Sequence, residues 1–524
     1  MTTDPTAEPT NGTTAATTAD GTTAATTPLL VASGITQRFG SLVANDHVDF
    51  DVMAGEVHAL LGENGAGKST LMKVLYGVNV PQEGTVTVSG TPLEPGSTAA
   101  SRAAGIGMVF QDLRLIPAFT VLENIDLALD SAGSRKERRA KLLEAGERWG
   151  LPVDPDRAVR DLSLAERQRV EILRVLLLDA KAVILDEPTS ALAPQEVDAL
   201  LAVVDQLRAD GLGVVIITHK LRETRAIADR ATILRGGKVT LGGADPKAFT
   251  DDELVELMVG SVPPPLPDQR PPRRNLTALA VNGLHVAGND GRKAVRDVTF
   301  EVRAGELVGV AGVSGNGQLE LLEAVLGVRT VDRGTVHIDG IDTTNRSPAA
   351  ALAAGAYNVP EDLVEDAVVP GLSVLRTIAL SGEPFPRKGL GIDWKALKAR
   401  VEGRAEPKRL NLAALDRDVA SLSGGNVQRV ALTRMFLVDD PKLLVVAYPS
   451  RGLDIASVRA TQQLLLERRA EGAAVLMVSE DLDELLGIAD RLVVLHDGEI
   501  AGIVDAAGAD RQQIGRLMLQ GAAA

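Results

Sequence analysis

The chain has 524 residues, which is too long for one ordinary domain and suits two or more. It contains no cysteine, which excludes disulfides and thiolate metal sites and fits a reducing cytosol. No apolar run reaches the length of a membrane span, so work at a membrane would require partners. The net charge of −15 argues against nucleic acid as the main partner, because phosphate binding needs a basic surface.

The first 260 residues divide into a tail and an α/β domain. Residues 1–27 are mostly Thr, Ala and Gly, cannot bury a core, and predict a disordered tail. Residues 28–260 alternate short apolar runs with longer periodic segments, such as the helix predicted over 195–209. The apolar runs, bounded by Gly or Asp, predict buried strands at 57–61, 182–186 and 214–218. This alternation indicates a mainly parallel sheet with helices on both faces.

A phosphate-loop motif follows the first of these strands. Gly62 and Gly67 are separated by four residues and are followed by Lys68 and Ser69. The glycines let the backbone wrap phosphate oxygens and point its N–H groups at them. Lys68 is expected to reach the β- and γ-phosphates of a nucleotide, and Ser69 to bind Mg²⁺. The predicted nucleotide-binding residues are Gly62, Glu63, Asn64, Gly65, Ala66, Gly67, Lys68, Ser69 and Thr70.

Two carboxylates end the strand predicted over 182–186. Asp186 can hold Mg²⁺ through water, and Glu187 is placed to polarise the attacking water. A carboxylate that merely caps the next helix is the alternative, and the phosphate loop in the same domain favours the catalytic interpretation. His219, which follows the next strand, could contact the γ-phosphate and hold the water.

Two further residues each allow two interpretations. Gln111 lies between the phosphate loop and the acidic strand. It is either a catalytic and metal-contacting residue or an ordinary loop amide. Phe39 lies upstream of the phosphate loop and could stack on adenine or belong to the core.

A proline-rich spacer and an internal repeat follow. The prolines of residues 261–275 predict an extended, semi-rigid connection. Beyond it, three segments of the first domain recur in the same order, namely 55–70 at 305–320, 161–174 at 421–434 and 182–192 at 444–453. The nearly constant offset indicates a duplicated domain at residues 276–520. Its predicted strands are 307–311, 443–447 and 475–479, and its clearest predicted helix is 455–471.

The second domain lacks the chemical groups of the first. Gln318 and Leu319 stand where the phosphate loop needs Lys and Ser/Thr. The other replacements are Ala447 and Tyr448 for the carboxylate pair, Glu480 for the histidine and Glu361 for the glutamine. The loss of these groups together is expected to abolish hydrolysis by this domain's own machinery.

The motifs resemble those of the ABC transporter ATPases. In that family the phosphate loop, a glutamine loop (Gln111), a signature at a helix start (Leu162 to Glu166), the Asp-Glu pair and a switch histidine (His219) occur in this order. The resemblance covers residues 28–520. It implies two tandem ABC-type P-loop domains, each with a mainly parallel sheet, an added antiparallel part and a helical subdomain. It also implies that each ATP site forms between the phosphate loop of one domain and the signature of the other.

The first domain has the intact phosphate loop, whereas the second domain has the intact signature. The second signature, Ser423, Gly424, Gly425 and Asn426, is close to the family consensus. At a helix N-terminus it offers a hydroxyl, N–H groups and a positive dipole end to a phosphate. The first signature has the bulkier Leu164 and Ala165 at the glycine positions. Head-to-tail pairing therefore predicts one competent composite site and one degenerate site.

Fused ABC domains without membrane spans occur in sugar and nucleoside importers and in soluble ABC-F translation factors. The single competent site, the short spacer and the acidic balance favour the importers. The second-domain sequences GVSGNGQ (312–318), PSRGLD (449–454) and SEDLDE (479–484) resemble the basic-membrane-protein-type nucleoside importers more than the ribose and galactose importers.

The resemblance also implies cofactors, partners and location. It implies ATP and Mg²⁺, two membrane-spanning permease subunits and an extracellular substrate-binding lipoprotein. The chain would lie peripherally on the cytoplasmic face of the cell membrane. Because one chain supplies both domains, a homodimer is not required.

Overall fold

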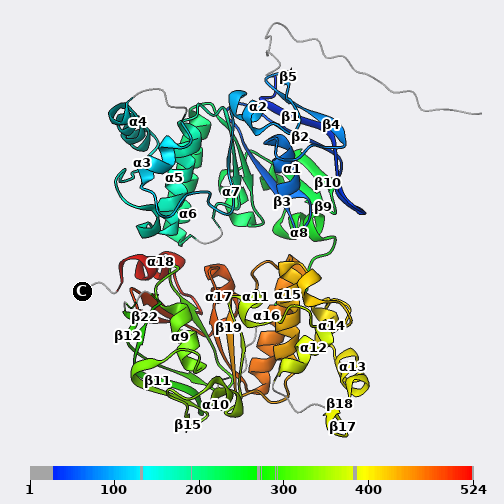
Figure 1. Ribbon diagram of the computed structural model, residues 1–524, viewed down its shortest axis with the longest axis vertical. Coiled ribbons are helices and arrows are strands. Elements are labelled where there is room, and N and C mark those ends of the chain that lie inside the picture. The colour runs from blue at the N-terminus through cyan, green and yellow to red at the C-terminus, as the bar shows by residue number, and fades with distance from the viewer. Residues whose placement is uncertain are drawn as a thin grey trace, which may run out of the picture.

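The computed structural model describes residues 27–129, 134–189, 192–267, 272, 274–289, 291, 293–381 and 386–521. Figure 1 shows two α/β halves, one above the other, which we call half 1 (28–260) and half 2 (276–520). The predicted tail, apart from Thr27, and residues 268–271 and 273 of the proline-rich spacer lie outside the described residues.

Half 1 contains two sheets. The antiparallel sheet has the order β2-β1-β4-β5, formed by β1 (Leu30–Phe39), β2 (Leu42–Val52), β4 (Glu83–Val88) and β5 (Thr91–Pro92). The other sheet has the order β10-β9-β3-β8-β7-β6 and is parallel except for β10. Its strands are β3 (Val57–Gly62), β6 (Ile106–Val109), β7 (Ala182–Asp186), β8 (Gly213–Ile217), β9 (Arg230–Arg235) and β10 (Lys238–Ala244).

The helices of half 1 cover this sheet and form a separate group at one side. Figure 1 shows α3, α4 and α5 together at that side, as the implied helical subdomain requires. The helices are α1 (Lys68–Leu75), α2 (Thr98–Ala103), α3 (Val121–Asp126), α4 (Arg135–Arg148), α5 (Leu164–Leu176), α6 (Pro194–Ala209), α7 (Leu221–Ile227) and α8 (Asp251–Val259).

Half 2 repeats both sheets. The antiparallel sheet β12-β11-β14-β15 is formed by β11 (Thr277–Ala287), β12 (Lys293–Arg303), β14 (Val331–Ile338) and β15 (Ile341–Asp342). The larger sheet, β16-β19-β20-β13-β21-β22, is formed by β13 (Leu307–Ala311), β16 (Ala356–Val359), β19 (Leu443–Ala447), β20 (Ala474–Val478), β21 (Arg491–His496) and β22 (Glu499–Asp505). A small hairpin joins β17 (Arg387–Lys388) and β18 (Gly391–Ile392). The matching strand order confirms the duplication.

The helices of half 2 follow the same plan. They are α9 (Gln318–Val325), α10 (Pro348–Ala353), α11 (Leu363–Asp366), α12 (Val374–Ile378), α13 (Trp394–Gly403), α14 (Glu406–Arg409), α15 (Gly424–Phe436), α16 (Ile455–Glu471), α17 (Leu482–Ile488) and α18 (Arg511–Gln520). Within the described residues, every helix is too short or too polar to span a bilayer.

The central strands are apolar, apart from Asp186 at the end of β7, because they are covered on both faces. All residues of β7, β8, β13, β19 and β20 are buried. Val, Leu, Ile and Ala dominate the core, as expected for a chain with 2% aromatic residues. The six strands predicted from apolar runs are thereby confirmed to within one residue.

The halves face each other head to tail. In half 1, α6 contacts α18 of half 2, where Gln195 Nε2 donates to the Gln512 carbonyl at 2.9 Å. Gln512 Nε2 in turn donates to Asp198 Oδ2 at 2.8 Å. On the other side, Asn64 Nδ2 of the first phosphate loop donates to the Leu453 carbonyl of half 2 at 3.0 Å. Figure 1 shows α18 below α6 accordingly.

Candidate active site

The first phosphate loop has the backbone that a phosphate cradle needs. Gly62 has φ +146° and Gly67 has φ +104°, a region that side chains rarely adopt. A Cβ atom on Gly67 would lie 2.2 Å from the Ala44 carbonyl oxygen, so no larger residue fits there. Helix α1 begins at Lys68 directly after the loop. The loop N–H groups and the positive end of the helix dipole therefore lie together.

Lys68 holds its charge at the centre of the loop. Its Nζ donates to the carbonyl oxygens of Gly62 at 2.7 Å and Glu63 at 2.9 Å, and its side chain is buried. Burial lowers the pKa of Lys68, whereas the charges of Glu187 and Asp186 oppose that shift. The charges of both carboxylates therefore act on the ammonium group, whose contact with a nucleotide stays a prediction.

Asp186 and Ser69 form a pair of oxygen donors. Ser69 Oγ lies 3.5 Å from Asp186 Oδ1, although the two residues are far apart in sequence. Burial raises the pKa of Asp186 to about 6, and the neighbouring Glu187 carboxylate adds to the shift. A dication placed between these oxygens would offset both unfavourable effects.

Glu187 lies close to the two remaining predicted catalytic residues, Gln111 and His219. Gln111 Nε2 donates to Glu187 Oε2 at 3.2 Å, and His219 Nδ1 lies 3.6 Å from Glu187 Oε1. Because β6, β7 and β8 are parallel neighbours, their carboxyl ends place these three side chains at one edge of the sheet. Glu187 has φ +48°, a costly value for a residue with a side chain and one that is often found at functional sites.

These groups line one large cleft between the halves, with a volume of about 1170 Å³. Phe39 is 50% exposed and also lines the cleft, so the interpretation of Phe39 as a core aromatic is wrong. Its role in stacking on adenine stays a prediction. The ordinary-loop interpretation of Gln111 is weakened, because its amide bonds directly to Glu187.

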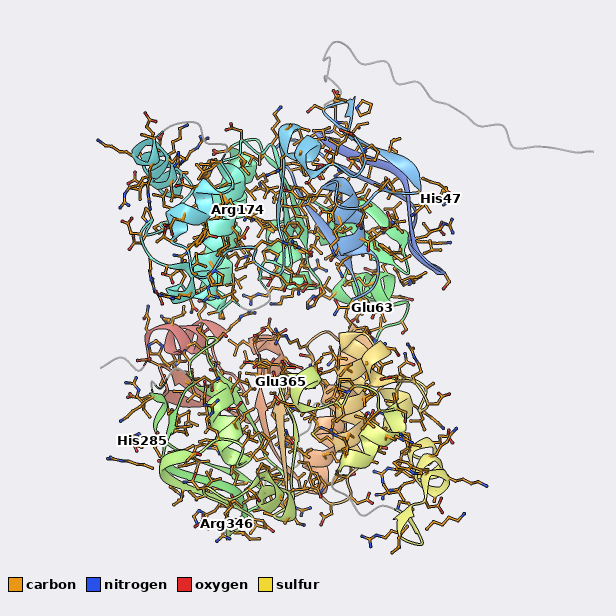
Figure 2. All side chains as sticks on the ribbon, in the orientation of Figure 1. His47, Glu63, Arg174, His285, Arg346 and Glu365 are labelled. Carbon is orange, nitrogen blue, oxygen red and sulfur yellow. The ribbon has the colours of Figure 1, made fainter. Side chains whose placement is uncertain are left out.

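A turn of half 2 at Leu453 and Asp454 also lines the cleft, which the sequence did not predict. The Leu453 carbonyl accepts the bond from Asn64, and Asp454 faces Glu63. Burial and the Asp454 charge raise the pKa of Glu63, which Figure 2 shows at the boundary between the halves. Behind this turn, a Cβ atom on Gly425 would lie 2.5 Å from the Gly452 carbonyl. The second signature therefore packs on the turn that contacts the first phosphate loop. The signature residues themselves do not line the cleft.

The two signature helices are capped differently. Ser163 Oγ accepts from the Glu166 backbone N–H at 3.2 Å, and a Glu166 carboxylate oxygen accepts from Ser163 N–H at 2.7 Å. This capping box places a negative charge at the N-terminus of α5, where a phosphate would have to approach. Ser423 instead accepts from the uncharged Asn426 side chain at 3.0 Å. The Ser-x-x-Glu spacing is visible in the sequence and could have predicted this difference.

The second phosphate loop has a backbone like that of the first loop but lacks its lysine. Gly317 has φ +95°, and α9 begins at Gln318 as α1 begins at Lys68. Gln318 Nε2 donates to the Val313 carbonyl at 3.1 Å and the side chain is buried. The amide thus keeps one of the two kinds of loop bond that Lys68 makes, the one to the carbonyl after the first glycine, but supplies no positive charge to a phosphate.

Carboxylates surround the equivalent of the hydrolytic centre in half 2. Tyr448 has φ +46°, which matches the strained backbone of Glu187. Arg451 lies 5.9 Å from the Tyr448 ring centroid, and its Nη1 is 3.3 Å from Glu361 Oε1. Burial raises the pKa of Glu361 and of Glu480, and Arg451 opposes both shifts. Two carboxylates in place of Gln111 and His219 disfavour a triphosphate.

Glu484 is a buried carboxylic acid of half 2. It is buried in α17 and accepts hydrogen bonds from Ser479 Oγ at 2.6 Å and Ser450 Oγ at 2.9 Å. Burial raises its pKa from 4.5 to about 7. Because the folded state then binds the proton more tightly than the unfolded chain, the free energy of unfolding falls as pH rises between these two values.

We therefore expect Glu484→Gln to stabilise the protein at pH 8 by about 1–3 kcal/mol and to have little effect at pH 4.5. The amide keeps an oxygen acceptor for both serine hydroxyls. Chemical denaturation at the two pH values measures the difference. Equal stabilisation at both would contradict a buried ionised carboxylate as the cause.

Two P-loop ATPase folds that face each other head to tail, with the predicted catalytic residues Lys68, Gln111, Glu187 and His219 lining one cleft, define an ATPase of the ABC class. Residues 45–190 and 295–446 match the family described as ABC transporter. The chain belongs to that family.

Relatives extend over nearly the whole chain. It is 40% identical to the nucleoside import ATP-binding protein NupA of Lactococcus lactis, over 93% of this chain and 97% of that protein. It is 42% identical to the ribose import ATP-binding protein RbsA 1 of Streptomyces avermitilis, over 93% of this chain and 92% of that protein. Among solved structures, the RNase-L inhibitor matches with a TM-score of 0.61 at 21% identity, over 88% of this chain and 87% of that one, which shows the fold alone.

Proposed function

We propose that this chain is the ATP-hydrolysing subunit of an importer that takes up nucleosides. The likeness to NupA over 97% of that protein carries the proposal. The half 2 sequences at 312–318, 449–454 and 479–484 support it, because they resemble the nucleoside importers. A simple-sugar importer is the second candidate, which the likeness to ribose import proteins favours. The likeness to the RNase-L inhibitor shows the fold alone and does not support the ABC-F alternative.

ATP is expected to bind in the cleft with its phosphates in the first phosphate loop and its adenine on Phe39. Lys68 would neutralise the β- and γ-phosphates. Glu187, held by Gln111 and His219, would orient the attacking water, so that catalysis is mostly positioning and charge neutralisation. Ser423, Gly424, Gly425 and Asn426 would close on the γ-phosphate from half 2.

Ser69 and Asp186, with Gln111 nearby, would hold Mg²⁺. The fit rests on the two oxygens 3.5 Å apart and on the raised pKa of Asp186, which a dication would lower again. When bound, the ion would neutralise part of the phosphate charge.

Two permease subunits would dock near Gln111 and its counterpart Glu361, on the cytoplasmic face of the membrane. An extracellular lipoprotein would deliver the ligand to them. Closure of the halves over ATP would move the permeases, and hydrolysis at the competent site would reopen them. The degenerate site would stay inactive through this cycle.

Uptake of labelled nucleosides tests the function. Cells without the chain should lose purine or pyrimidine nucleoside uptake, while ribose and galactose uptake stays unchanged. The wild-type chain should restore uptake, whereas Glu187→Gln, expressed at the same level, should not. Loss of sugar uptake alone would move the assignment to the sugar importers, and no transport defect at all would contradict the importer proposal.

A further inference from the structure

Arg429 lies in α15, one helical turn after Asn426 of the second signature, and its guanidinium group contacts three side chains. Nη1 donates to Asn426 Oδ1 at 3.1 Å, Nε donates to Ser457 Oγ at 3.1 Å, and Nη2 donates to Asp454 Oδ2. The ion pair with Asp454 is mostly buried, since only 15% and 19% of the two side chains are exposed. Arg429 therefore joins the signature helix to the start of α16, which Figure 1 shows beside α15.

The start of α16 is also the part of half 2 that contacts the first phosphate loop. Asn64 Nδ2 donates to the carbonyl of Leu453, the residue before Asp454, at 3.0 Å. Glu63 of the same loop lies near Asp454 as well. Burial and the Asp454 charge raise the pKa of Glu63, and the charge of Arg429 opposes that rise. The Asn64 bond and the Arg429 bonds together form a continuous connection from the first phosphate loop to the second signature.

The bond from Arg429 determines which way the Asn426 amide faces. A guanidinium group only donates hydrogen bonds, so the atom that it contacts is the amide oxygen. The amide nitrogen, Nδ2, then faces Ser423 and donates to its Oγ at 3.0 Å. Because this NH₂ group cannot accept a bond, the Ser423 hydroxyl keeps its own proton for another acceptor. Ser423 is exposed at the N-terminus of α15, where that proton is available to an anion.

Half 1 has the equivalent arginine, Arg169, but different residues at the positions that Arg429 contacts. These three positions are occupied by Glu166, Ala193 and Glu196. The two carboxylates accept from backbone groups instead, Glu166 from the Ser163 N–H at 2.7 Å and Glu196 from the Ala193 N–H at 2.9 Å. An ionised carboxylate only accepts hydrogen bonds, so Glu166 cannot donate to a serine hydroxyl as the Asn426 amide does. The arrangement around Arg429 is therefore specific to the second signature, which pairs with the intact phosphate loop.

We propose that Arg429 is a positioning residue of the competent ATP site, which holds the Asn426 amide so that the Ser423 hydroxyl donates to the γ-phosphate. Without Arg429 the amide can turn over, and its oxygen then accepts the Ser423 proton that the phosphate needs. The inference rests on the proposed function, in which the second signature closes on the γ-phosphate. A hydroxyl that is already oriented needs no rearrangement when the halves close, which favours binding of the triphosphate.

A comparison of ATP with ADP separates this role from a general effect on folding. ADP lacks the γ-phosphate, so the orientation of the Ser423 hydroxyl should matter for ATP alone. Both nucleotides, labelled at the ribose, are titrated by fluorescence with Mg²⁺ in the full chain that carries Glu187→Gln, which prevents turnover. In this background Arg429→Gln should weaken ATP binding about fivefold and leave ADP binding within about twofold. Equal losses for both nucleotides, or no loss for ATP, would contradict the proposal.

A double-mutant cycle tests whether Arg429 acts through the serine. Ser423→Ala should weaken ATP binding about tenfold, and its combination with Arg429→Gln should be no weaker than Ser423→Ala alone. Losses that multiply to about fiftyfold would show that Arg429 acts by another route. Asn426→Ala removes the intermediate side chain without a change of charge. It should show the same ATP-selective loss, absent after Ser423→Ala, and it carries the test even if Arg429→Gln lowers the stability of half 2.

Arg169→Gln is the matched control, because Arg169 has the equivalent place on α5, with Ala193 where half 2 has Asp454. It should leave the affinities for both nucleotides within about twofold of the Glu187→Gln parent. If Ser423→Ala weakens ATP binding selectively and Arg429→Gln does not, the role of Arg429 is wrong and the proposed function stands. If Ser423→Ala leaves ATP binding unchanged, the second signature does not contact the γ-phosphate, and the proposed function fails at that point together with this inference.

Discussion

Replacing Glu187 by Gln should lower steady-state ATP hydrolysis by about 100-fold or more and leave ATP binding within about threefold of wild type. Glutamine has nearly the same shape, so the contacts with Gln111 and His219 need little rearrangement. It cannot accept the proton of the attacking water. Lys68 and the loop N–H groups that would hold the phosphates are unchanged.

Phosphate release measures hydrolysis, and the fluorescence of a labelled ATP analogue measures binding. Tyr448→Phe is the matched control, because Tyr448 occupies the equivalent strand end of half 2 with the same positive φ. This control should hydrolyse ATP within about twofold of wild type. If Glu187→Gln keeps more than a tenth of the wild-type rate, a second hydrolytic site must exist in the chain.

The sequence predicted the fold well where local signals are strong. The run at 182–186 is a strand in the structure because it is apolar from Ala182 to Leu185 and ends at the charged Asp186. The helix predicted at 455–471 has the same bounds in the structure, with Asp454 as its N-cap and Gly472 at its C-terminus. The clustering of Gln111, Glu187 and His219 followed from parallel strands, whose carboxyl ends share one edge of the sheet.

Contacts between the halves could not be predicted in this way. Asn64 and Leu453 are 389 residues apart, and no periodic pattern relates a loop amide to a backbone carbonyl across an interface. The exposure of Phe39 depends on where β1 ends relative to the cleft, which the sequence leaves open. The capping box of Ser163 and Glu166 could be read from the Ser-x-x-Glu spacing, in addition to the bulk of Leu164 and Ala165.

Lys68→Gln should reduce ATP affinity at least about tenfold and abolish measurable hydrolysis. Lys68 is the positive side chain at the centre of the loop, and an amide leaves the charge of the β- and γ-phosphates uncompensated. Gln318 shows that glutamine fits this position, since it bonds to the Val313 carbonyl of its own loop. Thermal unfolding should therefore change little, and the loss can be assigned to charge rather than to misfolding.

The reverse change, Gln318→Lys, should restore no hydrolysis in half 2. The rate of phosphate release should stay at the wild-type value, because Tyr448 still replaces the catalytic carboxylate and Leu319 still lacks a hydroxyl. The opposing signature also keeps the Glu166 carboxylate at its helix N-terminus. A doubled rate of phosphate release would show that the missing lysine alone had silenced the second site.

The double variant Lys68→Gln with Gln318→Lys separates the position of the lysine from its presence. Like the wild type, this variant has one Lys and one Gln at these positions of the two phosphate loops. Each residue now lies in the other half. It should be inactive, because the lysine then lies apart from Asp186, Glu187 and His219 and faces the carboxylate-capped signature. Activity in this variant would contradict the assignment of hydrolysis to the site between the first phosphate loop and the second signature.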